Sequence, residues 1–144
     1  MPVARLTRVV AFSAAHRYFR PEWSVERNAE VFGPCAGEHG HGHNYHCRVT
    51  VSGALDADTG MVMNLTDLDE ILREEVTERF DHRFINHDVP EFAPGKIVPT
   101  GEALAVFLWE RIGRRLPRHV VLESVRIQED PHLYAEYRGE EGDS

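Results

Sequence analysis

Cysteine is scarce in this sequence, with two residues in 144. Two cysteines cannot form the disulfide framework that holds small secreted domains together. The chain does not need one in order to fold, because a domain of this length buries about two-thirds of the surface that its unfolded chain exposes. We therefore expect each thiol to bind a metal, to react, or to pack as a small buried side chain.

Positive charge is also in short supply. The chain has 16 Lys and Arg against 24 Asp and Glu, which gives a formal net charge of -8. Its overall field would not attract nucleic acid or an anionic membrane, so we expect neither as a partner. A negatively charged substrate would need a local positive site, such as a bound metal ion.

Long apolar runs are missing as well, and the mean hydropathy is -0.41. The run VVAFSAA has only the minimum length of a signal-peptide core, about 7 residues, and is followed by His16 and Arg17. No run approaches the roughly 20 residues of a membrane-spanning helix, so a cytoplasmic location is expected. Without repeats or linkers, residues 1–144 are predicted to form a single domain, with 139–144 as a flexible acidic tail.

The sequence does contain two segments, 5–16 and 44–55, in which apolar and polar residues alternate as in half-buried strands. The acidic turn DADTG at 56–60, followed by MVMNL, predicts a hairpin with the second segment. The side chains expected on one face are Val10, Phe12, Ala14 and His16 in the first segment, and Tyr45, Cys47, Val49 and Val51 in the second. His46 falls on the opposite face of its strand.

Helical periodicity and capping residues predict the remaining elements. Helices are expected at 26–32, 67–79 and 102–116. Thr66 is the expected N-cap of the second helix, and the third begins after Thr100. The last strand is expected over 119–130 and continues in LYAEY. Strands joined by hairpins instead of regular β-α alternation indicate an α+β domain with a mostly antiparallel sheet.

The densest group of potential ligands is CAGEHGHGHNYHC, which runs from Cys35 to Cys47. Side chains two residues apart on a strand lie on one face, about 6 to 7 Å apart. His39, His41 and His43 would then share a face, and two of them could converge on one metal ion. His16 ends the first strand and is the candidate for a third ligand. Three histidines with an open fourth position are typical of a catalytic zinc.

A structural zinc site built from Cys35, Cys47 and two histidines is the competing interpretation. Its spacing does not match that of zinc fingers, and Cys47 falls in the apolar row of its strand. Cys35 instead lies in a loop, GPCAGEHG, expected to reach over the histidine face. A thiol with a lowered pKa could act there as a base or nucleophile.

Carboxylates and a second group of histidines complete the candidates. The segment FDHRFINHD holds the pair Asp81-His82 and the reversed pair His87-Asp88. Either acid-histidine pair could tune a nearby thiol. Glu129, at the end of the last long strand, could accept hydrogen bonds from the N–H groups of a polar heterocycle.

Taken in order, these motifs resemble the 6-pyruvoyl-tetrahydropterin synthase family over nearly the whole chain. The motifs are FSAAHR, FGPC followed after five residues by HGHNY, GMVMNLTDL, FDHRFIN, DVPEFA, PTGEALAVFLW and the terminal Glu129. The resemblance implies the tunnelling fold, a four-stranded antiparallel sheet with two helices on one face. It also implies that three sheets close into a barrel, that two trimers stack into a hexamer, and that the active sites lie between subunits.

The resemblance further implies a role for each matching residue. His16, His41 and His43 would bind zinc, and Cys35 would be the general base. Asp81 and His82 of an adjacent subunit would form the relay that tunes Cys35.

Glu129 would anchor the pterin ring with help from Thr100. The next position often carries a hydroxyl in the family and is Gly101 here. The implied reaction converts 7,8-dihydroneopterin triphosphate to 6-pyruvoyl-tetrahydropterin with loss of triphosphate, and Mg²⁺ often accompanies such substrates.

Three alternatives stay open at this point. The 6-carboxy-tetrahydropterin synthases of queuosine biosynthesis share the fold, the zinc and the substrate, and release acetaldehyde. They place three residues between Cys and HxH, a spacing that Cys35-AGE-His39-Gly-His41 also satisfies. A non-catalytic zinc-binding assembly protein and a zinc-free Cys-His-Asp thiol hydrolase are the alternatives from other classes.

Overall fold

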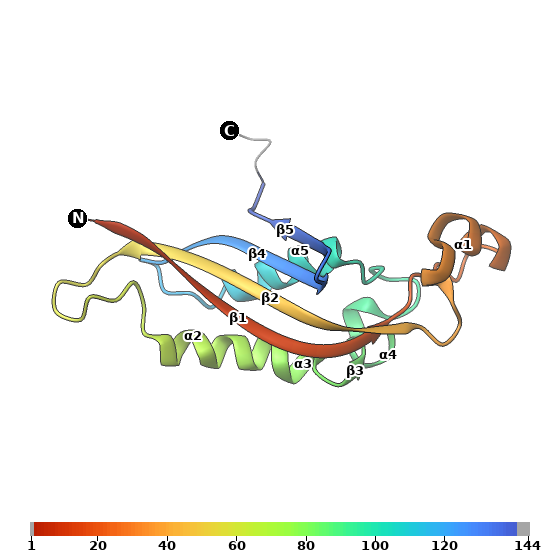
Figure 1. Ribbon diagram of the computed structural model, residues 1–144, viewed down its shortest axis with the longest axis horizontal. Coiled ribbons are helices and arrows are strands. Elements are labelled where there is room, and N and C mark those ends of the chain that lie inside the picture. The colour runs from red at the N-terminus through yellow and green to blue at the C-terminus, as the bar shows by residue number, and fades with distance from the viewer. Residues whose placement is uncertain (1, 141–144) are drawn as a thin grey trace.

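The computed structural model describes residues 2–140, whose centre is one twisted sheet with the strand order β3-β1-β2-β4-β5 (Figure 1). The strands are β1 (Val3–His16), β2 (His41–Ala54), β3 (Arg83–Phe84), β4 (Val121–Asp130) and β5 (Leu133–Tyr137). The four longer strands pair antiparallel, and β3 runs parallel to β1. The predicted α+β class with a mostly antiparallel sheet is confirmed, and the two-residue β3 adds a fifth strand to the four that the family resemblance implies.

The longest ladder joins β1 to β2 and pairs Val3 with Ala54 at one end and His16 with His41 at the other. Alternation along both strands sends Phe12, Tyr45 and their same-face neighbours into the core. Because the register is fixed along the whole ladder, the last residue of β1 lies beside the first residue of β2. Two histidines distant in the sequence therefore meet at one end of the sheet.

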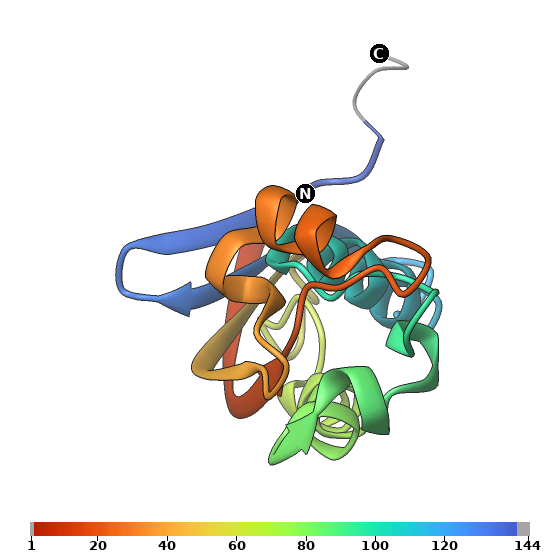
Figure 2. The same ribbon diagram turned by 90° about the vertical axis from the view of Figure 1, so that its right-hand side faces the viewer.

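Two helical segments cover one face of the sheet (Figures 1 and 2). The first runs through α2 (Leu65–Leu72), a π-helical turn η2 (Arg73–Thr77) and α3 (Glu78–Phe80), and the second is α5 (Gly101–Gly113). The smaller elements are α1 (Val25–Phe32), η1 (Gly33–Ala36), α4 (Ile85–Asp88) and η3 (Pro90–Phe92). The helices predicted from periodicity are confirmed, with ends displaced by one to three residues in the second and third.

The third helix begins directly after Thr100, as predicted, but the N-cap predicted for the second helix is wrong. The Thr100 side chain accepts a hydrogen bond of 3.0 Å from the backbone N–H of Ala103, as expected for a cap. Thr66 was the wrong choice for α2, because the chain is already helical there. Asn64 is the cap: its backbone is extended, and its side chain accepts from the backbone N–H of Thr66 at 2.8 Å.

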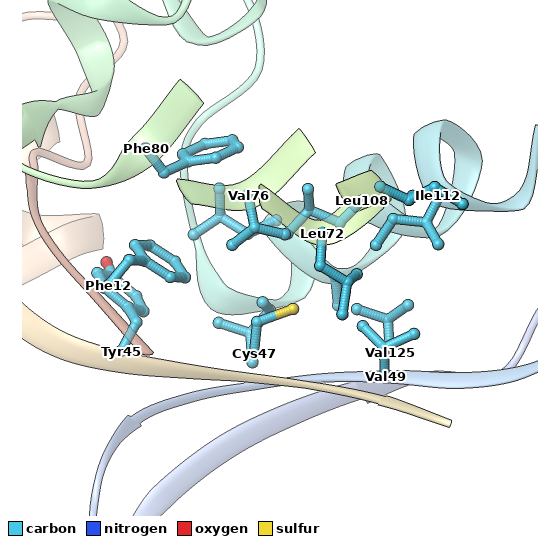
Figure 3. Packing of buried hydrophobic residues seen from close by; sticks show 14 of the residues in the cluster. Phe12, Tyr45, Cys47, Val49, Leu72, Val76, Phe80, Leu108, Ile112 and Val125 are labelled. Carbon is cyan, nitrogen blue, oxygen red and sulfur yellow. The ribbon is translucent and has the colours of Figure 1, made fainter. Parts of the chain in front are cut away.

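The core lies between the sheet and the two helical segments (Figure 3). Side chains from strands and helices interdigitate there, and those labelled in the figure are Phe12, Tyr45, Cys47, Val49, Leu72, Val76, Phe80, Leu108, Ile112 and Val125. Burying each large apolar side chain contributes about 1.5–3 kcal/mol. The ring of Phe12 stacks on that of Tyr45 with centroids 4.7 Å apart, which orders the core beneath the histidine end of the sheet.

The predicted hairpin between 44–55 and MVMNL is wrong. The chain does turn at Asp56, whose backbone N–H donates to the carbonyl of Met61 at 3.0 Å. Val62 and Met63 then pack into the core instead of forming a strand. A strand has only two edges, and those of β2 are occupied by β1 and β4.

The C-terminal strand also differs from the prediction. The segment LYAEY does not continue β4 but turns back beside it as β5. The Asp130 side chain accepts from the backbone N–H of His132 at 2.7 Å and closes the turn. Of the predicted acidic tail, residues 141–144 lie outside the described part of the chain.

None of the helices within residues 2–140 combines the length and apolar character required to cross a membrane.

Candidate metal centre and adjoining pocket

Three histidines converge at the end of the β1–β2 ladder. His16 closes β1, and His41 and His43 open β2 on the core side of the sheet. One ring nitrogen from each lies within 4.8 Å of the other two, a set that could hold a metal ion. The Nε2 atoms of His16 and His41 are 3.2 Å apart. Two nitrogens bound to one tetrahedral zinc at about 2.0–2.1 Å would be separated by about 3.3 Å, so this spacing fits such an ion.

The tautomer of His16 is fixed by its surroundings. Its Nδ1 lies 2.7 Å from the carbonyl oxygen of Pro99, and a carbonyl can only accept, so Nδ1 carries the proton. The Nε2 lone pair is therefore free to face the other two histidines, and the Pro99 contact orients the ring as second-shell partners of metal ligands do. Burial lowers the pKa of His16 to about 4, which keeps the ring neutral at pH 7.

His43 gives the strongest indication that the three histidines bind a metal ion. Its Nε2 is buried and has no hydrogen-bond partner within residues 2–140. A buried polar atom without a partner costs about 1–3 kcal/mol, and a metal ion shared with His16 and His41 would satisfy it. Glu129 approaches the same nitrogen, with its Oε2 3.8 Å away. The carboxylate is 7% exposed and links the three histidines to the cavity beside them.

That cavity, of about 450 Å³, lies between the start of α5 and the β4–β5 hairpin. Among its lining residues are Tyr18, Thr100, Gly101, Glu129 and Ala135. The absence of a side chain at Gly101 matters, because a Cβ there would lie 3.2 Å from Glu129 Oε1. The structure thus brings Thr100, Gly101 and Glu129 to one pocket next to the three histidines.

Cys35 lies in the 3-10 turn η1, and its side chain is partly exposed. Gly33 begins this turn with a φ of 59°, a left-handed conformation that glycine adopts without strain. The backbone N–H of Tyr18 donates to the Cys35 carbonyl at 2.8 Å and ties the turn to the chain just after His16. This contact brings the predicted base near the three histidines.

Asp81 and His82 are held against the outer edge of β1. Asp81 Oδ1 accepts from the backbone N–H of Ser13 at 2.8 Å, and the His82 N–H donates to the Ser13 carbonyl at 2.6 Å. The His82 ring lies 3.0 Å from Asp81 Oδ2. The Ser13 contact and then His82 lower the pKa of Asp81, against the opposing effect of burial.

His82 combines a left-handed backbone with an exposed ring. Its φ is 61°, a strained value for a residue other than glycine, and its side chain is 84% exposed. The ring lines a depression that includes His43 and Asn44 but not Cys35. Within one chain, therefore, His82 shares a depression with His43, and Cys35 is not among the residues that line it.

Residues 5–140 match the family described as 6-pyruvoyl tetrahydropterin synthase. The chain belongs to this family. A 6-pyruvoyl tetrahydrobiopterin synthase of Drosophila melanogaster is 44% identical over 138 residues, which cover 96% of this chain and 81% of that protein. The corresponding Homo sapiens protein is 41% identical over 137 residues, covering 95% of this chain and 92% of that protein.

The structure of the Caenorhabditis elegans 6-pyruvoyl tetrahydropterin synthase superposes with a TM-score of 0.90 at 35% identity. The similarity covers 97% of this chain and 98% of that one. The predicted family and its fold are confirmed by sequence and structure alike.

For this member of the 6-pyruvoyl tetrahydropterin synthase family, the structure separates the histidines of the cluster. His39 lies in an exposed turn before β2 begins, so the predicted sharing of a face with His41 and His43 is wrong. His46 is exposed on the opposite face, as predicted. Cys47 is fully buried in the apolar row and is not part of the metal-capable group.

Two tyrosines near the group were not identified from the sequence. Tyr45 Oη lies 3.1 Å from His16 Nδ1, and Tyr18 Oη lies 3.4 Å from Glu129 Oε1. Burial raises the pKa of both hydroxyls, so both keep their protons at neutral pH. The alternation that placed His41 and His43 on one face also includes Tyr45 and could have indicated it. Tyr18 is the second residue after the end of β1, where the alternation no longer applies.

Proposed function

We propose that this protein is a zinc-dependent 6-pyruvoyl-tetrahydropterin synthase, a lyase that converts 7,8-dihydroneopterin triphosphate to 6-pyruvoyl-tetrahydropterin with elimination of triphosphate. The observation that carries the proposal is the approach of Glu129 to His43, 3.8 Å between Oε2 and Nε2. Through this contact, the three histidines that could hold a metal ion lie next to a pocket in which Glu129 can accept hydrogen bonds. The Drosophila and human relatives, both 6-pyruvoyl tetrahydrobiopterin synthases, support the pyruvoyl product.

The residues divide the work between holding the ring and moving protons. Glu129 would accept hydrogen bonds from the N–H groups of the pterin ring, with Thr100 and Gly101 forming the adjoining wall. Zinc, held by His16, His41 and His43, would act as a Lewis acid on the side-chain hydroxyls and acidify the neighbouring C–H bonds. The Cys35 thiolate would remove those protons and return them during the internal redox shift.

Asp81 and His82 would tune Cys35 from an adjacent subunit. Within one chain, the depression that His82 lines does not include Cys35, which is compatible with this arrangement. We propose a trimer whose sheets close into a barrel, and a hexamer made of two trimers, with residues 1–144 as a single domain in each subunit. A cytoplasmic location and Mg²⁺ as a companion of the triphosphate complete the proposal.

The test is product identification and metal analysis on one purified sample. Incubation with 7,8-dihydroneopterin triphosphate should release triphosphate and form 6-pyruvoyl-tetrahydropterin, and the sample should contain one zinc per chain. Removal of zinc by chelation should abolish turnover, and added zinc should restore it. Acetaldehyde release would overturn the pyruvoyl assignment in favour of the carboxy product. Undiminished turnover without metal would overturn zinc dependence.

Matched histidine variants test the ligand set. His41→Ala should lose most of the zinc, whereas His39→Ala, two residues earlier, should keep it because His39 is exposed and outside the group. Equal zinc loss in both variants would contradict the proposed ligands.

The base has a test of its own. Cys35→Ala should keep its zinc and lose about 10²–10⁴-fold in kcat, the usual contribution of a general base. His39→Ala serves again as the control that retains activity. Full activity of Cys35→Ala would assign the proton transfer to another group.

A further inference from the structure

Tyr18 has contacts with three parts of the candidate site. Its ring meets the ring of His16 edge-on, with centroids 4.9 Å apart, and that of His41 at 6.4 Å. Its backbone N–H holds the Cys35 carbonyl at 2.8 Å. Its hydroxyl reaches Glu129 Oε1 at 3.4 Å. A single residue thus connects the metal-capable group, the turn that carries the thiol and the carboxylate of the pocket.

The Glu129 carboxylate has little else to fix its position. An ionised carboxylate can only accept, so the Tyr18 hydroxyl is the donor of their hydrogen bond. Glu129 is buried, with 7% of its surface exposed. Among the described residues 2–140, Tyr18 is the one side chain that donates a hydrogen bond to it. Glycine at position 101 lets Oε1 lie close to the backbone there, since a Cβ would be only 3.2 Å from that oxygen. Glu129 itself lines the cavity, so its remaining acceptor positions are available to a ligand there.

We infer that Tyr18 is a positioning residue for the heterocycle: its hydroxyl orients the Glu129 carboxylate toward the pocket, and its ring forms the wall between that pocket and the three histidines. The inference rests on the proposed function and adds a determinant of ring binding to it. The ligand is a planar heterocycle with adjacent N–H donors. Tyr18 lines the cavity itself. The bound heterocycle would therefore lie against the Tyr18 side chain.

Tyr18→Phe tests the inference because it removes one hydroxyl and leaves the backbone contact to Cys35 and the edge contacts to the histidines. The probe is 7,8-dihydroneopterin, which has the ring and side chain but no triphosphate, and its binding to zinc-loaded protein is measured by calorimetry. A hydrogen bond to a charged group contributes about 1.5–3 kcal/mol, which corresponds to roughly 10- to 100-fold in affinity. Because the Tyr18 bond is long, we expect the lower end, a Kd about tenfold weaker.

The kinetic readout separates positioning from chemistry. With the triphosphate substrate, KM should rise about as much as Kd while kcat stays within about twofold, and the zinc content should not change. Tyr137→Phe is the matched control, since it removes a hydroxyl from a tyrosine that packs on Trp109 outside the pocket. It should bind the probe like the original protein.

A double-mutant cycle tests the coupling from the other side. In a Glu129→Gln background, Tyr18→Phe should weaken probe binding by less than about twofold, because the charged acceptor is gone. The same loss in both backgrounds, or no loss from Tyr18→Phe in the original protein, would overturn the inference alone. Failure of the unaltered, zinc-loaded protein to bind the probe would overturn the proposed function together with it.

Discussion

At the scale of single residues, the two thiols of this chain have opposite surroundings. Cys47 is fully buried among the apolar side chains of β2 and α2 (Figure 3), and burial raises its pKa from 9.0 to about 12. Cys35 is partly exposed in a turn next to the candidate site. One thiol is therefore a packing group, and the other is available to chemistry.

A thiol-reactive chromogenic reagent should distinguish them. At pH 8 the native protein should react at one thiol per chain, and at two after unfolding in guanidinium chloride. Cys35→Ala should leave no reactive thiol in the native state. Two fast-reacting thiols in the native protein would contradict the burial of Cys47.

The raised pKa of Cys47 also predicts a pH dependence of stability. Above pH 9 the unfolded chain releases the Cys47 proton while the folded protein keeps it. A rise in pH therefore stabilises the unfolded state relative to the folded state. The stability contributed by this thiol is present below pH 9 and is lost as the pH rises toward about 12. Chemical unfolding at several alkaline pH values should show this loss in the original protein and a smaller one in Cys47→Ala.

Period-two alternation, which depends on local backbone geometry, limited the candidate metal ligands to His16 and three histidines before Tyr45, and the family resemblance selected His16, His41 and His43, the group that the structure brings together. The alternation did not resolve His39, since the residue at which β2 begins depends on a turn and on the pairing with β1. Tyr18 was missed for a related reason. Its hydroxyl meets Glu129, which is 111 positions away in the chain, and no local pattern reports such a contact.

At the scale of elements, Gly40 determines how β2 enters the site. Its φ is 69°, and a Cβ would lie 2.8 Å from Phe84 Cζ and 2.9 Å from the His16 carbonyl oxygen. The next residue is the ligand candidate His41. The close approach of β2 to the end of β1 therefore requires glycine at this position.

Gly40→Ala should lower stability and disturb the histidine group. A left-handed alanine costs about 1–2 kcal/mol, and overpacking against Phe84 and the His16 carbonyl adds about 1–3 kcal/mol. Zinc affinity should fall at least tenfold. Gly60→Ala is the control, because its φ is 72° with nothing within 4 Å of the new Cβ; it should lose stability but keep zinc. Equal zinc binding by both variants would contradict the role of Gly40.

Ion pairs of Glu75 with two arginines connect the two helical segments. Glu75, 7% exposed in the π-helical turn, accepts from Arg111 at 2.6 Å and from Arg115 at 3.1 Å. Burial raises the pKa of Glu75 and the two guanidinium groups lower it, with a net lowering from 4.5. Its contribution to stability is thus present above pH 4.5 and is lost as the pH falls further.

Glu75→Gln should lower the free energy of unfolding at pH 7 by about 1–2 kcal/mol. This value is below that of a fully buried pair, because the arginines are about one-third exposed and partly screened by solvent. Glu70→Gln, an exposed position of α2, should change it by less than about 0.5 kcal/mol. Urea unfolding provides the measurement, and equal effects of the two substitutions would refute the proposed coupling of the helices.

At the scale of the whole molecule, the sheet is covered on one face and open on the other. Within residues 2–140, side chains of the open face are largely exposed, and a depression of about 460 Å³ on it is lined by arginine, glutamate, serine and threonine. Strand β5 lies at the edge of the sheet and pairs only with β4 within this part of the chain, so its outer edge has no strand beside it there. Open faces and edges of this kind are used in assembly.

The mass in solution tests the proposed assembly. Light scattering should give three or six times the 16.4 kDa of one chain. All three candidate metal ligands come from one chain, so chelation of zinc should leave the mass unchanged. A monomeric mass at micromolar concentration would contradict an active site shared between subunits.

The sequence by itself determined the alternating strands, the helices and the α+β class, because hydrophobic periodicity acts over a few residues, and its ordered motifs selected His16, His41 and His43 through the family resemblance. Only the tertiary structure decided which strands pair with each other. It gave both edges of β2 to β1 and β4 and thereby excluded the expected hairpin, and it turned the last segment back as β5. It also placed Tyr18 between the histidines and Glu129, since contacts between distant segments depend on the packing of the whole chain.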